Sequence, residues 1–368
     1  MTNPVKGEPA VRIVKRDSIP TWKAWGIRGL AVLLALVISG LFIFAVTKLN
    51  PVAVYEAMFD GAFGTSRRSW VTIRDAMMLL CIGIGLAPAF KMKFWNIGAE
   101  GQILVGGCFT AGLMIYYGNS LPTPLLLIIM AAASLLGGAV WGVIPAVCKS
   151  RWDTNETLFT LMMNYVAIQL TSYCVALWEN PPGSNTVGII NGQTKGGWFP
   201  EVFGQAYLLN VLLVLALTVG MYVYLRSSKQ GYEISVVGES ANTARYAGIK
   251  LSRVYIRTMA ISGAICGLAG FIAVAGASHT ISTSTAGGRG FTAIIVAWLA
   301  KFNTFVMVLI SFLLVFLQKG AITIASKFNL NDYASNIITG IILFCIIGSE
   351  FFINYKLIFR GRKGAERK

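Results

Sequence analysis

The sequence predicts an all-α integral membrane protein with about ten transmembrane helices. Of its 368 residues, 55% are hydrophobic and only 12% are charged. Several stretches free of charge are long enough to cross a bilayer, for which about 20 apolar residues in a helix suffice. Lys and Arg gather between these stretches and at the two ends of the chain, which is the distribution that membrane topology imposes.

The expected spans run from one charged residue to the next. In chain order they are 29–47, 76–90, two crossings within 101–148, 157–178, 202–225, 258–288, 290–300, 302–318 and 333–349. The polar, Pro-bearing patch 116–124 is expected to be the turn between the two crossings of 101–148. Window 290–300 is short, because eleven helical residues rise only about 16 Å. It spans only if Arg289 or Lys301 reaches the interface, and it is otherwise a re-entrant or broken helix. Ten segments are expected in all, with eight as the fallback.

Orientation follows from the positive charges, which are retained on the cytoplasmic side. Placing both termini in the cytoplasm puts most of the 31 Lys and Arg residues there. Arg67, Arg68 and Arg74 are the exceptions and are expected outside, in a loop before the second span. The predicted organisation is a basic tail at 1–28, a single transmembrane domain at 29–355 with a cytoplasmic segment at 227–253, and a basic tail at 356–368. The first span is expected to be an uncleaved anchor.

The placement of charges and cysteines and the absence of catalytic motifs argue against several classes of function. The net charge of +16 lies at helix ends and tails, which argues for topology rather than nucleic-acid binding. The six Cys residues fall in or beside apolar segments with no CxxC pair, which indicates packing rather than a metal or disulfide framework. There is no GxxxxGK[ST] or HExxH run and no second carboxylate near Glu100. We therefore expect a protein that moves a solute and is not itself catalytic.

The run FWNIGAEGQ, residues 94–102, places an acid and two amides between long apolar segments. An uncompensated Glu is costly in hydrocarbon, so Glu100 must meet protein, water or the aqueous boundary. Amides pair with both donors and acceptors, which suits a polar solute. The predicted residues of the substrate pathway are Asn96, Glu100, Gln102, Asn164 and Gln169.

These residues also have structural alternatives. Asn96 could cap a helix that starts at Ile97, with Glu100 favoured near its amino end by the helix dipole. Asn164 could make a hydrogen bond between helices. Both alternatives stay open at the level of sequence.

The largest hydrophilic segment on the predicted cytoplasmic side is 227–253. Residues 241–249 have a helix-compatible composition, and Gly231, Gly238 and Gly248 are expected to form turns and a helix end. The segment is predicted to be a docking helix for a soluble partner, with an ordinary solvated connection as the alternative. The expected contacts are Ala244, Tyr246, Ala247 and Ile249, with Arg245 as an orienting charge.

Four motifs in register carry a resemblance to a known family. They are NIGAEGQ at 96–102, ETLFTLMMNYVA at 156–167, GYEISVVGESANTARYAGI at 231–249 and SGAICGLAG at 262–270. Together they resemble the permease subunits of bacterial ABC importers of the ribose and branched-chain amino-acid branch, and among these the permeases of nucleoside uptake systems. The resemblance covers most of residues 76–321. One departure is GGRGFTAIIVAWLA, where Thr292 stands at the position expected to be acidic.

The resemblance implies a BtuC-like type II importer in a bacterial cytoplasmic membrane. Two homologous permease subunits would form the pathway, two ABC ATPase subunits would bind ATP and Mg, and an extracytoplasmic substrate-binding protein would deliver the small-molecule substrate. This chain would bind no cofactor. The implied ATPase-coupling residues are Gly231, Gly238, Glu239, Ala244, Arg245, Tyr246, Ala247, Gly248 and Ile249.

Other functions remain open at this stage. An ABC importer of a sugar or of riboflavin would fit the same motifs. An ion-coupled secondary transporter would need intramembrane carboxylates and interrupted helices, and only Glu100 could serve as its ion or proton carrier. A membrane scaffold without transport activity is a third alternative.

Overall fold

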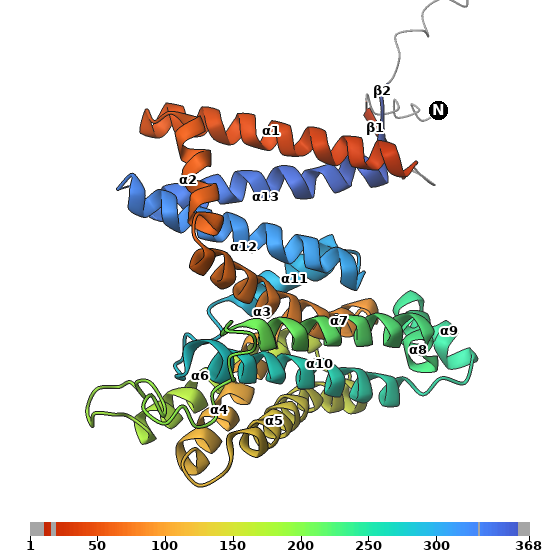
Figure 1. The fold of residues 1–368 in the computed structure, drawn as a ribbon. Coiled ribbons are helices and arrows are strands. Elements are labelled where there is room, and N and C mark those ends of the chain that lie inside the picture. Colours follow the sequence, from red (N-terminus) through yellow and green to blue (C-terminus); the bar gives the residue numbers. More distant parts are fainter. Residues whose placement is uncertain (1–10, 16–19, 330–331, 360–368) are drawn as a thin grey trace, which may run out of the picture. The chain divides into compact units, whose positions relative to one another are not determined.

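The computed structural model describes residues 11–15, 20–329 and 332–359, and these are almost entirely helical (Figure 1). Two short strands, β1 (Val11–Lys15) and β2 (Tyr355–Phe359), lie near the ends. The helices are α1 (Thr21–Thr47), α2 (Pro51–Phe63), α3 (Ser66–Lys91), α4 (Ala99–Tyr117), α5 (Thr123–Trp152), α6 (Glu156–Leu177), α7 (Leu208–Ser227), α8 (Lys229–Glu239), α9 (Ala241–Tyr246), α10 (Leu251–Ala273), the π-helix η1 (Val274–Ser278), α11 (Arg289–Leu299), α12 (Thr304–Lys327) and α13 (Asp332–Asn354).

Within the described residues, seven helical stretches are long and apolar enough to cross a membrane. They are Gly29–Thr47, Ser66–Lys91, Thr123–Trp152, Glu156–Leu177, Leu208–Ser227, Leu251–Ser278 and Thr304–Lys327. The chain is therefore a helical integral membrane protein, as its composition predicts. Helix α11 has 11 residues, which rise only about 16 Å, so it cannot cross a bilayer by itself.

Several predicted boundaries are wrong. Helix α3 begins at Ser66, so Arg67, Arg68 and Arg74 lie in a helix and not in a loop. Its first turn is stable because the Thr65 hydroxyl accepts a hydrogen bond from the Arg68 amide at 3.2 Å. Long Arg stems can also lie along apolar surface while their charges reach water.

Two further boundaries differ for local reasons. The sequence analysis missed α2, whose start is fixed by Pro51 and by Asn50, which accepts a hydrogen bond from the Val52 amide at 3.0 Å. The expected span 258–288 is shifted, because the helix begins at Leu251 and ends at Ser278. It ends there because His279 adopts the left-handed conformation, with φ 53°. The span expected from residue 202 begins at Leu208.

One compact unit consists of Met1–Gly64 with Leu317–Lys368. In it α1 packs along α13, and β1 pairs antiparallel with β2, with Val11 opposite Phe359. The pairing places residues 11–15 beside residues 355–359. Parts of the predicted tails, 1–10, 16–19 and 360–368, lie outside the described residues.

The second unit is Thr65–Phe316. Helix α10 is central to it and packs against α3, α4 and α5 (Figure 1). Glycines allow this packing: a Cβ on Gly138 would collide with the carbonyl oxygen of Gly263, and one on Gly106 with that of Gly267. Close approach of backbones at small residues is the usual way in which membrane helices associate.

The segment between α6 and α7 is folded against the end of η1. The rings of Trp198 and His279 stack with centroids 3.6 Å apart, and the Ile190 amide donates to the His279 carbonyl at 2.9 Å. Burial, followed by the charge of Arg74, lowers the pKa of His279 to about 4. The imidazole is therefore neutral at physiological pH and acts here as a packing group.

Candidate translocation and coupling sites

The chain is not helical between the end of α3 and the start of α4, and α6 holds this break in place. The Thr160 hydroxyl accepts a hydrogen bond from the Ile97 amide at 3.1 Å. The Asn164 side chain donates to the Ile97 carbonyl at 2.9 Å and accepts from the Gly101 amide at 2.9 Å. Backbone groups freed by a break inside a membrane protein need such partners. Asn164 therefore makes hydrogen bonds from α6 to a neighbouring segment, which was the structural alternative to a role in the substrate pathway.

Asn96 and Gln102 form a buried amide pair at the same break. Their exposed fractions are 0% and 1%, and the Asn96 amide donates to the Ser262 hydroxyl at 3.2 Å and to Gln102 at 3.4 Å. Asn96 also accepts from the Gly98 amide at 3.0 Å. Helix α4 then starts at Ala99 with Gly98 as its N-cap, so Asn96 does not cap a helix starting at Ile97.

The break lies well inside the helical unit. Ser262, its partner on α10, lies about 16 Å along that helix from the first residue, Leu251. Phe94 in the same segment is 2% exposed and packs against the Tyr255 ring at 5.9 Å. Phe94, Asn96 and Gly98 in this segment are buried. Membrane proteins tolerate non-helical backbone at depth where it is buried in protein or lines a water-filled cavity.

Glu100 is compensated by the start of another helix. Its Oε1 accepts a hydrogen bond from the Gly290 amide at 2.8 Å, at the first turn of α11. A carboxylate at a helix N-terminus satisfies an otherwise free N–H and is favoured by the helix dipole. Glu100 is 7% exposed, so protein provides the partner that its position requires.

Four of the five predicted pathway residues thus come together, and Gln169 does not. Gln169 is exposed on α6, whereas Asn164 on the same helix faces inward with 3% exposure. The other three lie at the break before α4 or in its first turn. The structure therefore places one polar cluster at the junction of α4, α6, α10 and α11.

A cleft of about 280 Å³ opens beside this cluster. Its walls come from α4, α6, the loop after η1 and the first turns of α11. Its polar and aromatic lining residues are Glu100, Asn164, Tyr165, Thr283, Ser284 and Phe291. Tyr165, Thr283, Ser284 and Phe291 were not predicted from the sequence. Thr283 and Ser284 were missed because they fell in the expected span 258–288. The cluster of Ser, Thr and Gly at 282–288 is typical of a loop and could have identified Thr283 and Ser284.

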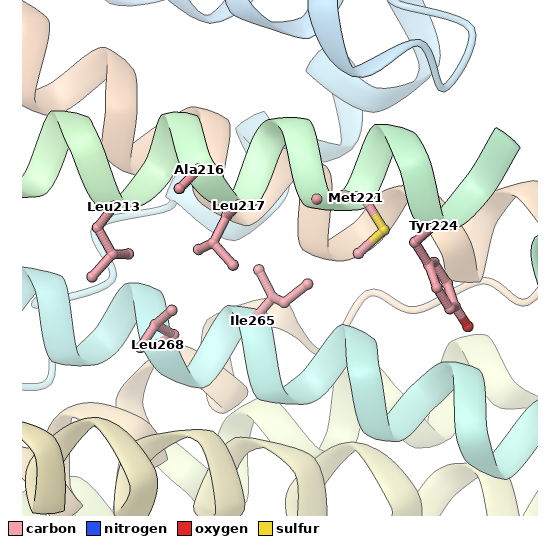
Figure 2. Close-up of a pocket in the computed structure, with 8 residues that line it drawn as sticks. Leu213, Ala216, Leu217, Met221, Tyr224, Ile265 and Leu268 are labelled. Atoms are coloured by element: carbon pink, nitrogen blue, oxygen red, sulfur yellow. The ribbon is translucent and has the colours of Figure 1, made fainter. Parts of the chain in front are cut away.

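A second and larger groove lies between α7 and α10 (Figure 2). It encloses about 480 Å³, and Leu213 and Leu217 point from α7 toward Ile265 and Leu268 on α10. Tyr224 is its one lining residue with a hydroxyl, which bonds to the Gln230 side chain at 3.0 Å. Such a surface suits lipid chains or another apolar helix rather than a polar solute.

The segment predicted to couple to a partner contains two helices, α8 and α9, instead of one. Gly231 and Gly238 lie within α8, so the expectation that they form turns is wrong. Ser228 caps α8 by accepting from the Gly231 amide at 2.9 Å. A Cβ on Gly238 would collide with the Lys91 carbonyl at the end of α3. A Cβ on Gly231 would also lie only 2.5 Å from the Tyr224 carbonyl oxygen. At both glycines another part of the backbone therefore lies too close for a side chain.

Helix α9 ends at Tyr246, three residues before the expected end at Ile249. Gly248 follows in the left-handed conformation, with φ 74°, which confirms its role in the helix end. Tyr246 is 93% exposed, whereas Ala244 is fully buried. Arg245, Ala247 and Glu239 are exposed and Ile249 is half-buried. Ala244 thus supports the helix from inside, and Tyr246 forms the exposed tip.

Two long helices, α10 and α3, anchor this pair of helices. Arg257 on α10 donates to Glu233 on α8 at 2.9 Å, and Gly238 rests on the end of α3. The segment is therefore attached to the long helices and is not a loosely solvated connection.

A family profile described as branched-chain amino acid transport system / permease component matches residues 71–347 of the chain. The chain belongs to this permease family. It is 30% identical over 353 residues to the glucose ABC transporter permease protein TsgB13 of Haloferax volcanii, covering 93% of this chain and 92% of the relative. It is 30% identical over 343 residues to the guanosine ABC transporter permease protein NupP of Bacillus subtilis, with coverages of 91% and 96%.

A third relative is the nucleoside ABC transporter permease protein NupB of Lactococcus lactis, 26% identical over 308 residues and covering 80% of this chain and 84% of that protein. No solved structure matches the chain. The resemblance drawn from the four motifs is confirmed, and the chain is a permease subunit of an ABC transporter. Subunits of this kind are not catalytic. The relatives carry different solutes by name, so the cargo of this chain is a matter for proposal.

Replacing Asn164 with leucine is expected to destabilise the unit by at least about 2 kcal/mol, because it leaves two buried backbone groups unpaired at about 1–3 kcal/mol each. The measurement is the apparent melting temperature of the detergent-purified protein. Gln169→Leu on the exposed face of the same helix is the matched control, with an expected change within about 0.5 kcal/mol. Equal melting temperatures for the two variants would contradict the assignment of Asn164 as a support of the break.

Proposed function

We propose that this chain is the transmembrane permease subunit of an ATP-driven importer of nucleosides. The ATPase-coupling part of this proposal is supported by the α8–α9 pair, whose exposed end at Tyr246 lies beyond a part that is attached to α3 and α10. Two relatives that are permeases for guanosine and for nucleosides support the cargo. ATP and Mg would be bound by the partner ATPase and not by this chain.

In the proposed cycle, ATP closes the ATPase pair and the movement passes through residues 231–249. Because Glu233 is paired with Arg257 and Gly238 rests on Lys91, a displacement of α8 would act directly on α10 and α3. The permease would then alternate between outward and inward openings. Such transmission requires contacts that differ between the two states.

The subunit would have a BtuC-like type II architecture with about ten crossings and both termini in the cytoplasm. Helices α4 and α13 would supply two crossings beyond the seven long apolar ones. Because α11 is too short to cross by itself, it would complete the ten only if Arg289 or Lys301 reaches the interface. A second homologous permease would complete the pathway, and an extracytoplasmic binding protein would deliver the solute. The localisation that follows is a bacterial inner membrane.

A sugar is the second candidate cargo, because the glucose permease of Haloferax volcanii is as similar in identity as the guanosine permease. Both solutes are neutral and rich in hydroxyls. They differ in the planar base, which only a nucleoside offers to aromatic side chains.

The test is purification of the chain with its partners from native membranes, followed by uptake of labelled guanosine or glucose into reconstituted vesicles. We expect an ATPase and a second permease to co-purify, and guanosine uptake to require ATP. Glucose uptake without guanosine uptake would select the second candidate. Uptake driven by an imposed proton or sodium gradient, from a chain that purifies alone, would contradict both and make Glu100 the leading ion-coupling residue.

A further inference from the structure

The cleft beside Glu100 combines three kinds of surface. Glu100 provides a carboxylate, Thr283 and Ser284 provide hydroxyls, and Tyr165 and Phe291 provide aromatic rings. Its volume of about 280 Å³ is just below the range of typical ligand pockets, which begins at about 300 Å³. A cleft of this size and composition fits one small solute with a planar ring and several hydrogen-bonding groups.

Glu100 is a fixed acceptor in this cleft. The Gly290 amide holds its Oε1 at 2.8 Å, so the carboxylate is oriented before any solute arrives. An ionised carboxylate accepts hydrogen bonds and donates none, and it pairs best with two donors on one edge. The ring N–H and the exocyclic amine of guanine form such an edge, whereas adenine presents a ring acceptor beside its amine.

The two aromatic side chains at the cleft are exposed and could therefore contact a solute. Tyr165 is 60% and Phe291 46% exposed. Any nucleobase can stack on such rings, because every base has a flat aromatic face. Beside them Gly287 and Gly288 adopt φ 59° and 75°, and a Cβ on Gly288 would meet nothing within 4 Å. The backbone there is open to close approach by a ligand.

We propose that this cleft binds the base of a guanosine-type purine nucleoside, with Glu100 accepting from its ring N–H and amine. Tyr165 and Phe291 stack on the base, and the hydroxyls of Thr283 and Ser284 face the ribose. This inference rests on the proposed nucleoside import and adds to it a defined site and a preferred base. The amides Asn96 and Gln102, already bonded to each other, support the site without touching the solute.

The experiment measures the KM for guanosine and for adenosine in ATP-dependent uptake by the reconstituted complex. Wild type is expected to prefer guanosine by at least about tenfold, since a site built to hydrogen-bond its substrate rejects analogues that leave its groups unpaired. Glu100→Gln keeps an oxygen for the Gly290 amide and adds a donor for adenine, so the preference is expected to disappear while the melting temperature is kept. A loss of folding alone in Glu100→Gln, or an equal rise of both KM values, would overturn the assignment.

A second variant tests the stacking surface without touching a buried group. Tyr165→Ala is expected to raise the KM for both nucleosides by about tenfold, the effect of losing one stacking ring. Tyr173→Ala, also exposed on α6 at 67% but outside the cleft, is the matched control and should leave both KM values unchanged. Equal effects of the two substitutions would overturn the site and favour a contact of this face with lipid or a second permease. If wild type imports nucleosides while the cleft variants behave as the control, only this inference fails; if it imports glucose and no nucleoside, both proposals fail.

Discussion

Replacing Gly138 with leucine is expected to prevent this protein from accumulating in folded form. A Cβ at this position would meet the Gly263 carbonyl and the backbone of Gly267, so α5 and α10 would have to separate along their contact. Overpacking a close-fitting core costs about 1–3 kcal/mol or more, and here the obstacle is rigid backbone rather than a movable side chain. The measurement is the fraction of membrane-extracted protein that elutes as one species in detergent, with its apparent melting temperature.

The matched control is Gly220→Leu on α7. A Cβ on Gly220 would meet nothing within 4 Å, and the residue lines the open groove of Figure 2. The same added side chain should therefore be tolerated, with a melting temperature close to that of wild type. Normal elution and melting of Gly138→Leu would show that α5 and α10 do not rely on this glycine contact.

The overall class could be predicted from the sequence because the bilayer imposes a strong constraint. Length and charge-free composition locate most long helices, since few other structures satisfy the backbone in hydrocarbon. Their ends could not be placed by charge alone. Local capping decides them: Thr65 starts α3 ahead of two arginines, and Asn50 with Pro51 starts α2.

The candidate site could be predicted in part for a related reason. Polar side chains between apolar segments need hydrogen-bonding partners, so the sequence could identify Asn96, Glu100 and Asn164 as residues that must have one. The partner of Glu100 was not, because Gly290 lies far along the chain and only the folded structure brings it near. Gln169 could have been separated from Asn164, since five residues turn a helix by about 140° and place the two side chains on different faces.

The same reasoning applies to the coupling segment. Glycines in a hydrophilic stretch predict turns when sequence is the only guide. Gly238 instead marks the place where α8 touches the end of α3, a tertiary contact that no local pattern encodes. Gly248 was predictable because a helix commonly ends at a glycine in the left-handed conformation.

Substituting proline for Gly248 is expected to abolish ATP-dependent uptake and stimulation of the partner ATPase, down to the level of vesicles without this subunit. Proline cannot adopt the observed φ of 74°, and it removes the amide that donates to the Arg245 carbonyl at 3.0 Å. The end of α9 would unfold, and with it the exposed tip at Tyr246. Arg245→Glu should have the same consequence by reversing the charge at this tip. The measurements are ATP hydrolysis and labelled nucleoside uptake by the reconstituted complex.

Membrane insertion should survive both changes, because Gly248 and Arg245 are exposed and a Cβ on Gly248 would meet nothing within 4 Å. Gly204→Pro is the matched control: Gly204 also has a positive φ, 72°, and also has open space around it, but it lies between α6 and α7. It should insert and still stimulate the ATPase, since any local unfolding there leaves α8 and α9 intact. Normal ATPase stimulation by both Gly248→Pro and Arg245→Glu would rule out α9 as the docking element, and the attachment of α8 to α3 and α10 would then have no role in coupling.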